Sequence, residues 1–279
     1  MASTINTNMP SLTSQRALST TNLSLSTSMQ RLSTGLRINS AKDDAAGLAI
    51  AQRMTSQVRG MNVASRNAND AISLAQTAEG ALGKIGESLQ RMRELAVQSA
   101  NATNASSDRA NLDQEYQALS AEVTRVIAGT KFNGKTLLNG SSGAMGFQIG
   151  PDNASTDMIT VSMNSIATGA GMAASITGAA ATISTAGSAL TAMSNLDTAI
   201  DEVTTARSML GSVQNRFESV VANLATSSEN LQAARGRIMD ADFAMETSNL
   251  SRAQVLQQAG NAMLAQANQA PQQVMSLLR

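Results

Sequence analysis

Residues 61–96 read "MNVASRNANDAISLAQTAEGALGKIGESLQRMRELA", and this stretch decides the fold. Its apolar residues recur at alternating spacings of three and four, which is the pattern of a helix packed in a coiled-coil seam. The seam residues are Met61, Ala64, Ala68, Ala71, Ala75, Ala78, Leu82, Ile85, Leu89, Met92 and Ala96. Because many of them are alanine, a partner helix can approach closely. Gly80 and Gly83 each weaken a helix by about 1 kcal/mol relative to alanine, so tertiary packing must stabilise it.

Two later stretches supply partners for this seam. The same spacing follows the polar link "NATNASSD" at Leu112, Tyr116, Leu119, Val123 and Val126, which predicts an antiparallel helical hairpin. Beyond residue 189 the large apolar residues lie seven apart, a repeat that implies left-handed supercoiling against a partner helix. They are Leu196, Val203, Leu210, Phe217, Leu224, Leu231 and Ile238. We expect the 61–96 seam to be that partner.

The two ends of the chain carry matching patterns. Near the N-terminus, Leu18, Leu25 and Leu32 are seven apart. Near the C-terminus, small and apolar residues alternate three and four apart, at Ala253, Leu256, Gly260, Met263, Ala267, Ala270, Val274 and Leu277. The ends therefore predict a second coiled coil, formed by the two termini.

The segment "INSAKDD" at 38–44 separates the terminal coiled coil from the main one. Ser40 is a good N-cap residue, and Asp43, three residues later, can complete an arrangement like a capping box. On the return path, "RGRIMDAD" at 235–242 predicts the matching break.

The centre of the chain changes character. Residues 130–164 are rich in Gly and Asn and hold short β-type runs at 136–138, 147–149 and 158–163, so we expect hairpins there. Residues 165–188 are mostly Ala, Ser, Thr and Gly. Because they offer little apolar bulk to bury, we expect a small, weakly structured insertion.

The predicted fold is mainly α: an elongated antiparallel coiled-coil rod with paired N- and C-terminal helices, small β-hairpins and a short insertion at the middle of the chain. The predicted domains are a terminal coiled-coil domain of residues 1–42 and 236–279, a core rod domain of residues 43–164 and 189–235 with hairpins at about 130–164, and an insertion of residues 165–188.

The composition excludes several classes of protein. The 279 residues include no Cys and no His, so the chain lacks the thiolate and imidazole groups behind most zinc sites and most nucleophile–base pairs. We therefore expect no enzyme, no metal and no cofactor. A formal net charge of zero argues against binding to nucleic acid, and the absence of a run of eighteen apolar residues argues against membrane insertion. The N-terminus "MASTINTNMP" lacks a basic n-region and an apolar h-region, so no cleaved signal peptide is expected.

Five motifs of the chain are distinctive. They are "STGLRINSAKDDAAG" at 33–47, "SRNANDAISLAQTAEGAL" at 65–82, "LQRMRELAVQSANATN" at 89–104, "VQNRF" at 213–217 and "SRAQVLQQAGNAMLAQANQAPQQVMSLLR" at 251–279. Together they resemble the motifs of one known family, bacterial flagellin, the subunit of the flagellar filament. The resemblance covers about residues 1–150 and 190–279. It leaves out 151–189, where flagellins vary, so residues 165–188 are expected to be a variable outer insertion.

The resemblance implies a structural subunit that polymerises with itself into an extracellular filament for motility. It also implies export by the flagellar type III route, with an export chaperone, the filament cap and the hook–filament junction proteins as partners. The expected polymerisation seam is Leu18, Leu25, Leu32, Leu256, Met263, Val274 and Leu277.

Two stretches resemble surfaces that host receptors bind. Arg91, Leu95, Gln98 and Glu115 match the patch by which flagellins engage the flagellin-sensing Toll-like receptor of vertebrates, although an ordinary ion pair between helices would also explain Arg91 and Glu115. Residues 30–51 resemble the epitope of the plant flagellin-sensing receptor kinase, although helix capping would also explain their polar residues. The matching polar residues are Arg37, Asn39, Ser40, Lys42, Asp43 and Asp44.

Three alternatives belong to other classes or subclasses. A hook–filament junction protein shares the terminal architecture, and copy number separates it from a filament subunit. Some flagellins carry a zinc protease in the central insertion, but that needs the motif "HExxH", and the chain has no His. A lipid-binding coil would need a strongly basic face, whereas the low charge and alanine-rich seams here favour packing between helices.

Overall fold

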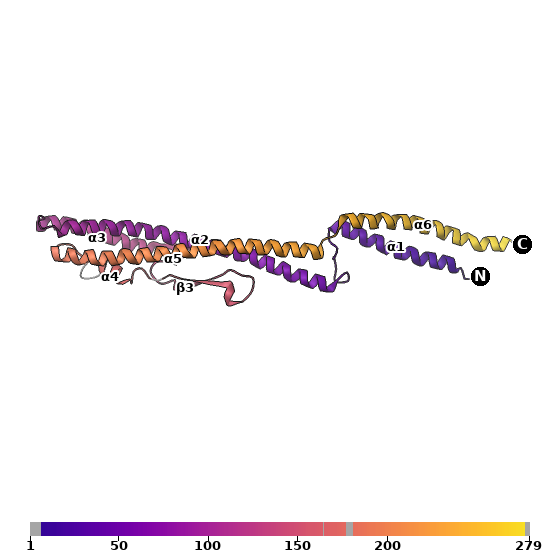
Figure 1. Cartoon of the computed structure of the whole chain (residues 1–279), viewed down its shortest axis with the longest axis horizontal. Helices are drawn as coiled ribbons and strands as arrows, with labels where there is room; N and C mark the ends of the chain where they lie inside the picture. Colours follow the sequence, from indigo (N-terminus) through magenta and orange to yellow (C-terminus); the bar gives the residue numbers. More distant parts are fainter. Residues whose placement is uncertain (1–6, 164, 177–180, 277–279) are drawn as a thin grey trace. The chain divides into compact units, whose positions relative to one another are not determined.

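The computed structural model describes residues 7–163, 165–176 and 181–276, with only the backbone described from residue 270 onward. These residues form six α-helices and two β-hairpins (Figure 1). The helices are α1 (Met9–Thr34), α2 (Ala45–Ala100), α3 (Ser106–Gly129), α4 (Ala170–Ile176), α5 (Ala186–Met239) and α6 (Phe243–Ser276). The strands are β1 (Lys131–Phe132), β2 (Lys135–Thr136), β3 (Ala144–Gln148) and β4 (Met158–Ser162), with a 3₁₀ turn at Ser155–Asp157. The predicted mainly α fold with small β-hairpins is confirmed.

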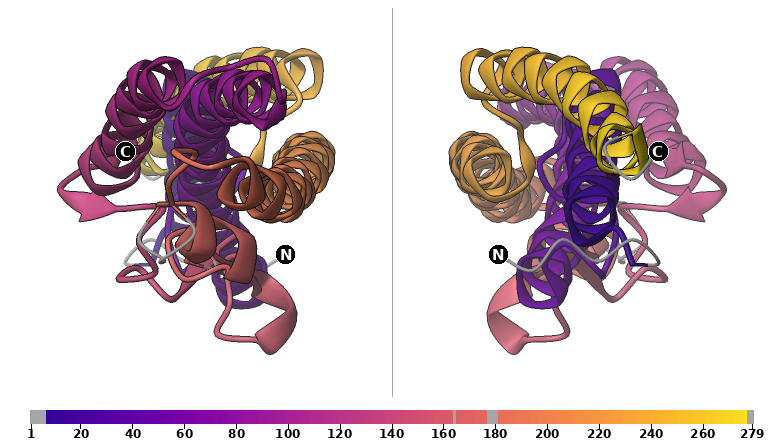
Figure 2. Two further views of the ribbon diagram at one scale, coloured as in Figure 1. Left: turned by 90° about the vertical axis from the view of Figure 1, so that its left-hand side faces the viewer. Right: turned by 90° about the vertical axis from the view of Figure 1, so that its right-hand side faces the viewer.

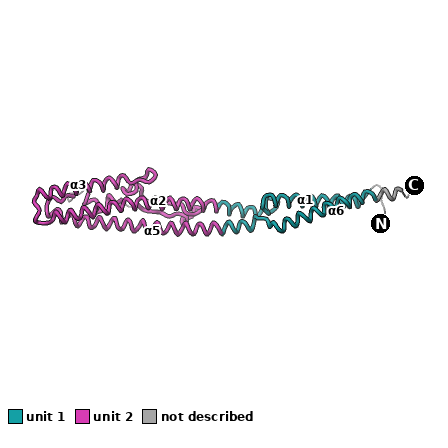
Figure 3. The backbone as a smooth tube through the Cα atoms, turned by 90° about the horizontal axis from the view of Figure 1, so that it is seen from above, with its two compact units in different colours: residues 1–56, 230–279 teal, residues 57–229 magenta. Residues whose placement is uncertain are grey.

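The chain divides into two compact units (Figure 3). Unit 1 comprises residues 1–56 and 230–279, and unit 2 comprises residues 57–229. The chain passes from one unit into the other within α2 and again within α5.

The core of unit 2 is built on the seam that the sequence shows. Every seam residue from Ala64 to Ala96 is buried, and Met61 is half-buried. Leu196, Val203, Leu210 and Phe217 of α5 are buried in the same cluster, as are Tyr116 and Val123 of α3. Polar contacts join α2 to its two neighbours, which lie beside it in the end views of Figure 2.

The two hairpins have simple local causes. A two-residue turn, Asn133-Gly134, joins β1 to β2, and both residues have positive φ angles of 47° and 79°, as a type I′ turn requires. β3 and β4 pair antiparallel, from Ala144 opposite Ser162 to Gln148 opposite Met158. The predicted run at 136–138 is wrong beyond Thr136, because Leu137 and Leu138 leave the strand and enter the core.

The segment 165–188 is better packed than its composition predicts. Met172 and Ile183 are fully buried, and residues 170–176 form helix α4. The carboxylate of Glu202 in α5 accepts hydrogen bonds from the first turn of α4, at 3.0 Å from the N–H of Gly171 and 3.2 Å from that of Met172. The expectation of little apolar bulk to bury is therefore wrong here, because a few large side chains reach the core. Residues 177–180 lie outside the described residues.

Unit 1 contains the paired terminal helices, and α1 and α6 lie side by side (Figures 1 and 2). Asn8 caps α1 and accepts from the N–H of Ser11, with Pro10 in the first turn. The seam of α6 runs through a partly different set of residues than predicted. Its residues of low exposure are Glu246, Asn249, Leu250, Ala253, Gln257, Gly260, Leu264 and Ala267, so the seam shares only Ala253, Gly260 and Ala267 with the predicted set in this part of the helix.

In unit 1, the helical structure is interrupted twice, between α1 and α2 and between α5 and α6. Gly35 ends α1 in the left-handed conformation, at φ 71°, and Leu36 forms a β-bridge with Asp240. The Ser40 N-cap predicted from the sequence is wrong: α2 begins at Ala45, and the carboxylate of Asp44 accepts from the N–H of Gly47 at 2.8 Å. Ser40 instead lies in the preceding turn.

Candidate functional site

The helices α1 and α6 carry almost no charge. Arg16 and Arg31 are the charged residues of α1, and Glu246 and Arg252 are those of α6. Soluble proteins average about one charged residue in four. These helices therefore carry far fewer charges than is usual for a helix surface in water, and their exposed polar residues are mainly uncharged Ser, Thr, Asn and Gln.

The hydroxyl groups on α1 are largely occupied by their own helix. Thr20, Thr21, Ser24 and Thr27 each donate to the carbonyl four residues earlier, at 3.0–3.1 Å. The hydrogen of a hydroxyl bonded in this way cannot form a second hydrogen bond with another partner. These hydroxyl oxygens can still accept hydrogen bonds, but their donors are used within α1.

Large apolar residues are exposed on both helices. On α6, Met245, Leu256 and Met263 are 65%, 52% and 59% exposed. They are separated by eleven and seven residues, close to three and two helical turns, so they share one face. We call these three residues the α6 stripe. On α1, the exposed residues are Met9, Leu12, Leu23 and Met29.

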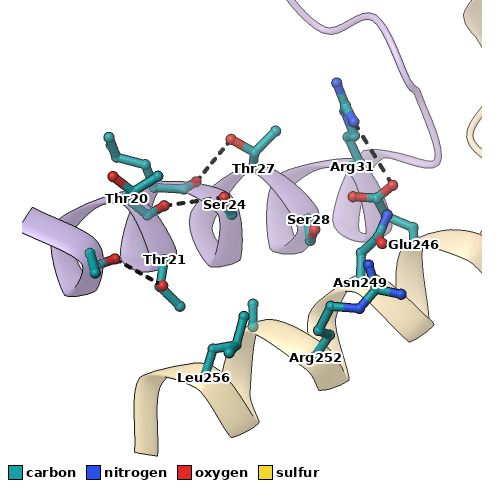
Figure 4. Close-up of a pocket in the computed structure, with 13 residues that line it drawn as sticks. Thr20, Thr21, Ser24, Thr27, Ser28, Arg31, Glu246, Asn249, Arg252 and Leu256 are labelled. Carbon is teal, nitrogen blue, oxygen red and sulfur yellow. Dashed lines mark hydrogen bonds and ion pairs between the residues drawn. The ribbon is translucent and has the colours of Figure 1, made fainter. Parts of the chain in front are cut away.

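A groove of about 780 Å³ lies between α1 and α6, and Leu256 is the one residue of the α6 stripe that lines it (Figure 4). Arg31 and Glu246 face each other at one end of it, with Nη1 of Arg31 3.9 Å from Oε2 of Glu246. Glu246 is buried, and Nε of Arg31 is buried with no hydrogen-bond partner among the described residues. Leu256 lines the groove, so the apolar stripe continues into it.

The predicted polymerisation seam divides between two environments. Leu18, Leu25 and Leu32 are half-buried on α1, and Leu18 approaches Gly260 of α6 closely. Leu256 and Met263 are exposed, so their predicted packing within the α1–α6 coiled coil is wrong. A shift of one residue turns a helical position by about 100°, and Gln257 and Leu264 take the inward positions. The side chain of Val274 and the whole of Leu277 lie outside the described residues.

The residues predicted to meet the vertebrate receptor form a polar network on α2 and α3. Nε and Nη2 of Arg91 lie 3.0 and 2.9 Å from Oε1 of Glu115, and Nη1 lies 2.9 Å from Oε2 of Glu94. The hydrogen bond to Glu94, followed by the one to Glu115, raises the pKa of Arg91. Gln98 is exposed nearby on the same helix, and the three polar residues predicted from the sequence are accessible.

Leu95 differs from the other three residues of this set. It is 1% exposed and belongs to the core of unit 2. Leu95 is therefore a core residue, unlike the exposed Arg91, Gln98 and Glu115. Since α2 has partners on two sides, α3 and α5, its buried arc is wide enough to include both Met92 and Leu95.

The residues resembling the plant epitope gather at the helix break of unit 1. Nη2 of Arg37 donates to the carbonyl of Ile238 at 2.7 Å. The carboxylate of Asp43 accepts from the N–H groups of Asn39 and Ser40 and from the Ser40 hydroxyl, at 3.1, 2.9 and 3.0 Å. These hydrogen bonds, chiefly that from the Ser40 N–H, lower the pKa of Asp43. Lys42 is exposed.

Two features were not predicted from the sequence: the Arg31–Glu246 pair and the exposed residues Leu12, Leu23 and Met245. The scarcity of charge in α1 and α6 was the available signal for the exposed residues. Within the described residues, no cluster of three or more Asp or Glu side chains is arranged to hold a metal ion. None of the described helices has the length and hydropathy of a membrane span.

Long helices that carry few charges and expose several large apolar side chains are typical of a structural subunit that assembles with other copies. Family models identify the kind of subunit: residues 5–143 match the bacterial flagellin N-terminal helical region, and residues 193–278 match the C-terminal helical region. The chain belongs to the bacterial flagellin family.

Individual relatives agree with the family models. The chain is 44% identical to a flagellin of Halalkalibacterium halodurans over 278 residues, 99% of each chain. It is 36% identical to flagellin A of Vibrio anguillarum over an alignment of 379 residues that covers both chains fully. The crystal structure of Bacillus cereus flagellin is 33% identical, with a TM-score of 0.51, over 61% of this chain and 94% of that one.

The family fixes the broad function. The protein is a structural subunit of the extracellular flagellar filament, and it polymerises with itself. The prediction that the chain is not an enzyme is confirmed, since flagellins are structural proteins.

Proposed function

We propose that neighbouring copies of the chain pack on one another through the exposed faces of α1 and α6. The observation that carries this proposal is the combination of few charges with the exposed α6 stripe, Met245, Leu256 and Met263. Each large apolar side chain contributes about 1.5–3 kcal/mol when it is fully buried. A surface of this kind gains free energy by leaving water, and in a filament subunit the available partner is another copy.

Placing a charge on the α6 stripe tests this proposal. Leu256→Asp would put an unpaired carboxylate into the contact, so seeded elongation of filaments should stop while the thermal melt of the monomer stays unchanged. Leu190→Asp is the matched control, because Leu190 is also an exposed leucine on a helix but belongs to unit 2. Normal elongation of the Leu256→Asp chain would contradict the proposed contact.

A second role, as a ligand of the vertebrate flagellin-sensing receptor, is proposed for the free subunit. The supporting observation is the accessible network of Arg91 and Glu115, with Gln98 beside it. Leu95 supports this surface from beneath rather than contacting a partner. In a reporter assay at equal folded concentration, Arg91→Ala should weaken signalling and Arg125→Ala should not. Arg125 is a suitable control because it is an exposed arginine paired with a glutamate, Glu122, on α3.

Recognition by the plant receptor kinase is proposed for the segment 30–51 once it is released from the folded chain. In the folded subunit, Arg37 and Asp43 are engaged in hydrogen bonds at the helix break. A peptide of residues 30–51 should therefore elicit a stronger response than the intact subunit. An equal response at equal concentration would show that release is not needed.

The remaining partners follow from family membership as proposals. We expect export by the flagellar type III route, a chaperone for the C-terminal segment, and contact with the filament cap and the hook–filament junction proteins. The alternative function, a junction subunit of the same superfamily, would use the same α1 and α6 faces. Counting chains per flagellum separates the two functions, since a filament subunit is present in far more copies than a junction subunit.

A further inference from the structure

The sulfur atoms of this chain are unevenly distributed. The chain has 16 Met and no Cys, so every sulfur belongs to a thioether. Among the described side chains of α1 and α6, four methionines are exposed: Met9, Met29, Met245 and Met263. In unit 2, Met92 and Met172 are fully buried, and only Met158 and Met209 are exposed among the described methionines. The oxidisable groups that reagents can reach are therefore concentrated on the faces proposed for assembly.

We propose that Met245 and Met263 are modification sites at which a peroxide converts the free subunit into a form unable to elongate a filament. This inference rests on the proposed contact through α1 and α6. In the reaction, the thioether sulfur attacks one peroxide oxygen, an S–O bond forms as the O–O bond breaks, and water leaves after proton transfer. Sulfur loses two electrons and the peroxide gains them.

The location of these two residues gives the modification its effect. Met245 and Met263 stand at the two ends of the α6 stripe, with Leu256 between them, so both would enter the contact together. A sulfoxide replaces an apolar, flexible side chain by a polar one. A polar group that is buried without a hydrogen-bond partner weakens an association, roughly tenfold for each group.

The same reaction should leave the fold of the subunit intact. Met245 and Met263 are 65% and 59% exposed, so their sulfoxides remain in water in the free chain. Met239, which packs on Ile38 in unit 1, is buried and should react last among the methionines of that unit. Assembly should therefore be lost before the melting temperature changes.

Limited oxidation of the purified full-length chain with hydrogen peroxide tests the inference. Mass spectrometry of peptides should find Met245 and Met263 oxidised early and Met92 unchanged. Elongation from unoxidised seeds should fall at least about tenfold, with an unchanged thermal melt, and methionine sulfoxide reductases should restore it. The double variant Met245→Leu, Met263→Leu should elongate normally and should lose less elongation on oxidation than the unmodified chain, although Met9 and Met29 of α1 can still be oxidised in it.

Met158→Leu is the matched control, because Met158 is also about half exposed but lies in β4 of unit 2. This variant should lose elongation on oxidation as the unmodified sequence does. Undiminished elongation by chains oxidised at both sites, or protection by Met158→Leu alone, would overturn the inference while leaving the proposed function intact. Failure of the unoxidised chain to elongate would overturn the proposed function as well.

Discussion

Unit 1 and unit 2 are both helical, but they bury their apolar residues in opposite ways. In unit 2, α2, α3 and α5 enclose a continuous core that includes Leu82, Leu89, Tyr116 and Phe217. In unit 1, the buried apolar residues among those described are Ile38, Ala51, Met239 and Ala253. Most of the exposed large apolar residues of the described chain lie in unit 1, although it is the smaller unit.

This difference teaches where each unit obtains its stability. A helix in water is stabilised mainly by the packing of its apolar face. Unit 2 satisfies this requirement within one chain. Unit 1 satisfies it only in a small cluster of Ile38, Ala51 and Met239 and along the seam between α1 and α6. Along this seam, Gly260 and Ala253 permit close approach but bury little area. We propose that other copies of the chain cover the remaining exposed apolar residues of unit 1.

The largest effect should come from emptying the core of unit 2. Phe217 is fully buried and its ring lies 5.6 Å from that of Phe147, in an edge-to-face arrangement. Phe217→Ala should lower the free energy of unfolding by about 3–5 kcal/mol, through lost burial and a cavity. Chemical denaturation of the monomer measures it. Phe243 is an exposed phenylalanine of unit 1. If Phe243→Ala lowers the free energy of unfolding as much as Phe217→Ala does, the contrast between the two units is wrong.

A somewhat smaller effect is expected where the receptor-facing surface meets the core. Leu95→Ala should destabilise the monomer by about 2–5 kcal/mol, because Leu95 is buried. Arg91→Ala should hardly change the melt, because the ion pairs of Arg91 are exposed to solvent. Thermal melts of the two variants sharpen the distinction between core and surface on one helix. A melt of Leu95→Ala like that of the unmodified chain would contradict it.

Removing the cap of α2 should have a moderate effect. Asp44→Ala removes the carboxylate that accepts from the N–H of Gly47, at a cost of about 1 kcal/mol. Hydrogen exchange should show the loss at the first turns of α2 and leave α3 unchanged. Ser40→Ala is the useful control, because Ser40 does not cap this helix; a larger effect at Ser40 than at Asp44 would contradict the observed boundary.

The smallest effect should depend on pH. Hydrogen bonds from Ser40 and Asn39 lower the pKa of Asp43 below its ordinary value of 3.8. A carboxyl whose pKa is lower in the folded state stabilises the fold above the unfolded pKa, and this contribution is lost as the pH falls through the folded value. Asp43→Asn should therefore melt slightly below the unmodified chain at neutral pH, and the difference should vanish in acid. If the difference in melting temperature between the two chains grew as the pH falls, its pH dependence would be opposite to the expected one and would contradict the lowered pKa of Asp43.

The sequence predicts the core of unit 2 well, for a physical reason. Large apolar residues such as Leu82 and Phe217 recur with one period along their helices. Each helix therefore has a single apolar face that can be buried. The seam of α6 was harder to place. Gly260 and Ala267 occur in both possible seams, and Met263 and Leu264 compete for one inward position with similar hydrophobicity, whereas Gln257 takes an inward position although Leu256 is the more hydrophobic. Only the approach of α1 decides between them.

The candidate site was predictable in its polar residues and less so in its apolar ones. The Arg91–Glu115 pair follows from two helices packed antiparallel. The three-four seam of α2 predicts burial against one partner helix and does not include Leu95. Because α2 contacts helices on two sides, more of its surface is buried, including Leu95. The cap at Asp44 was missed because Ser40 and Asp44 are both good N-cap residues. The turn that Asp43 closes decides which of them caps the helix.

Amide hydrogen exchange of the monomer and of the assembled filament tests the central claim most directly. In the monomer, the amides of α1 and α6 should exchange much faster than those of α2 between residues 61 and 96, because unit 1 buries so little apolar surface. In the filament, α1 and α6 should become protected to a similar degree, while unit 2 changes little. Slow exchange of α1 and α6 already in dilute monomer, with no further protection on assembly, would contradict the account.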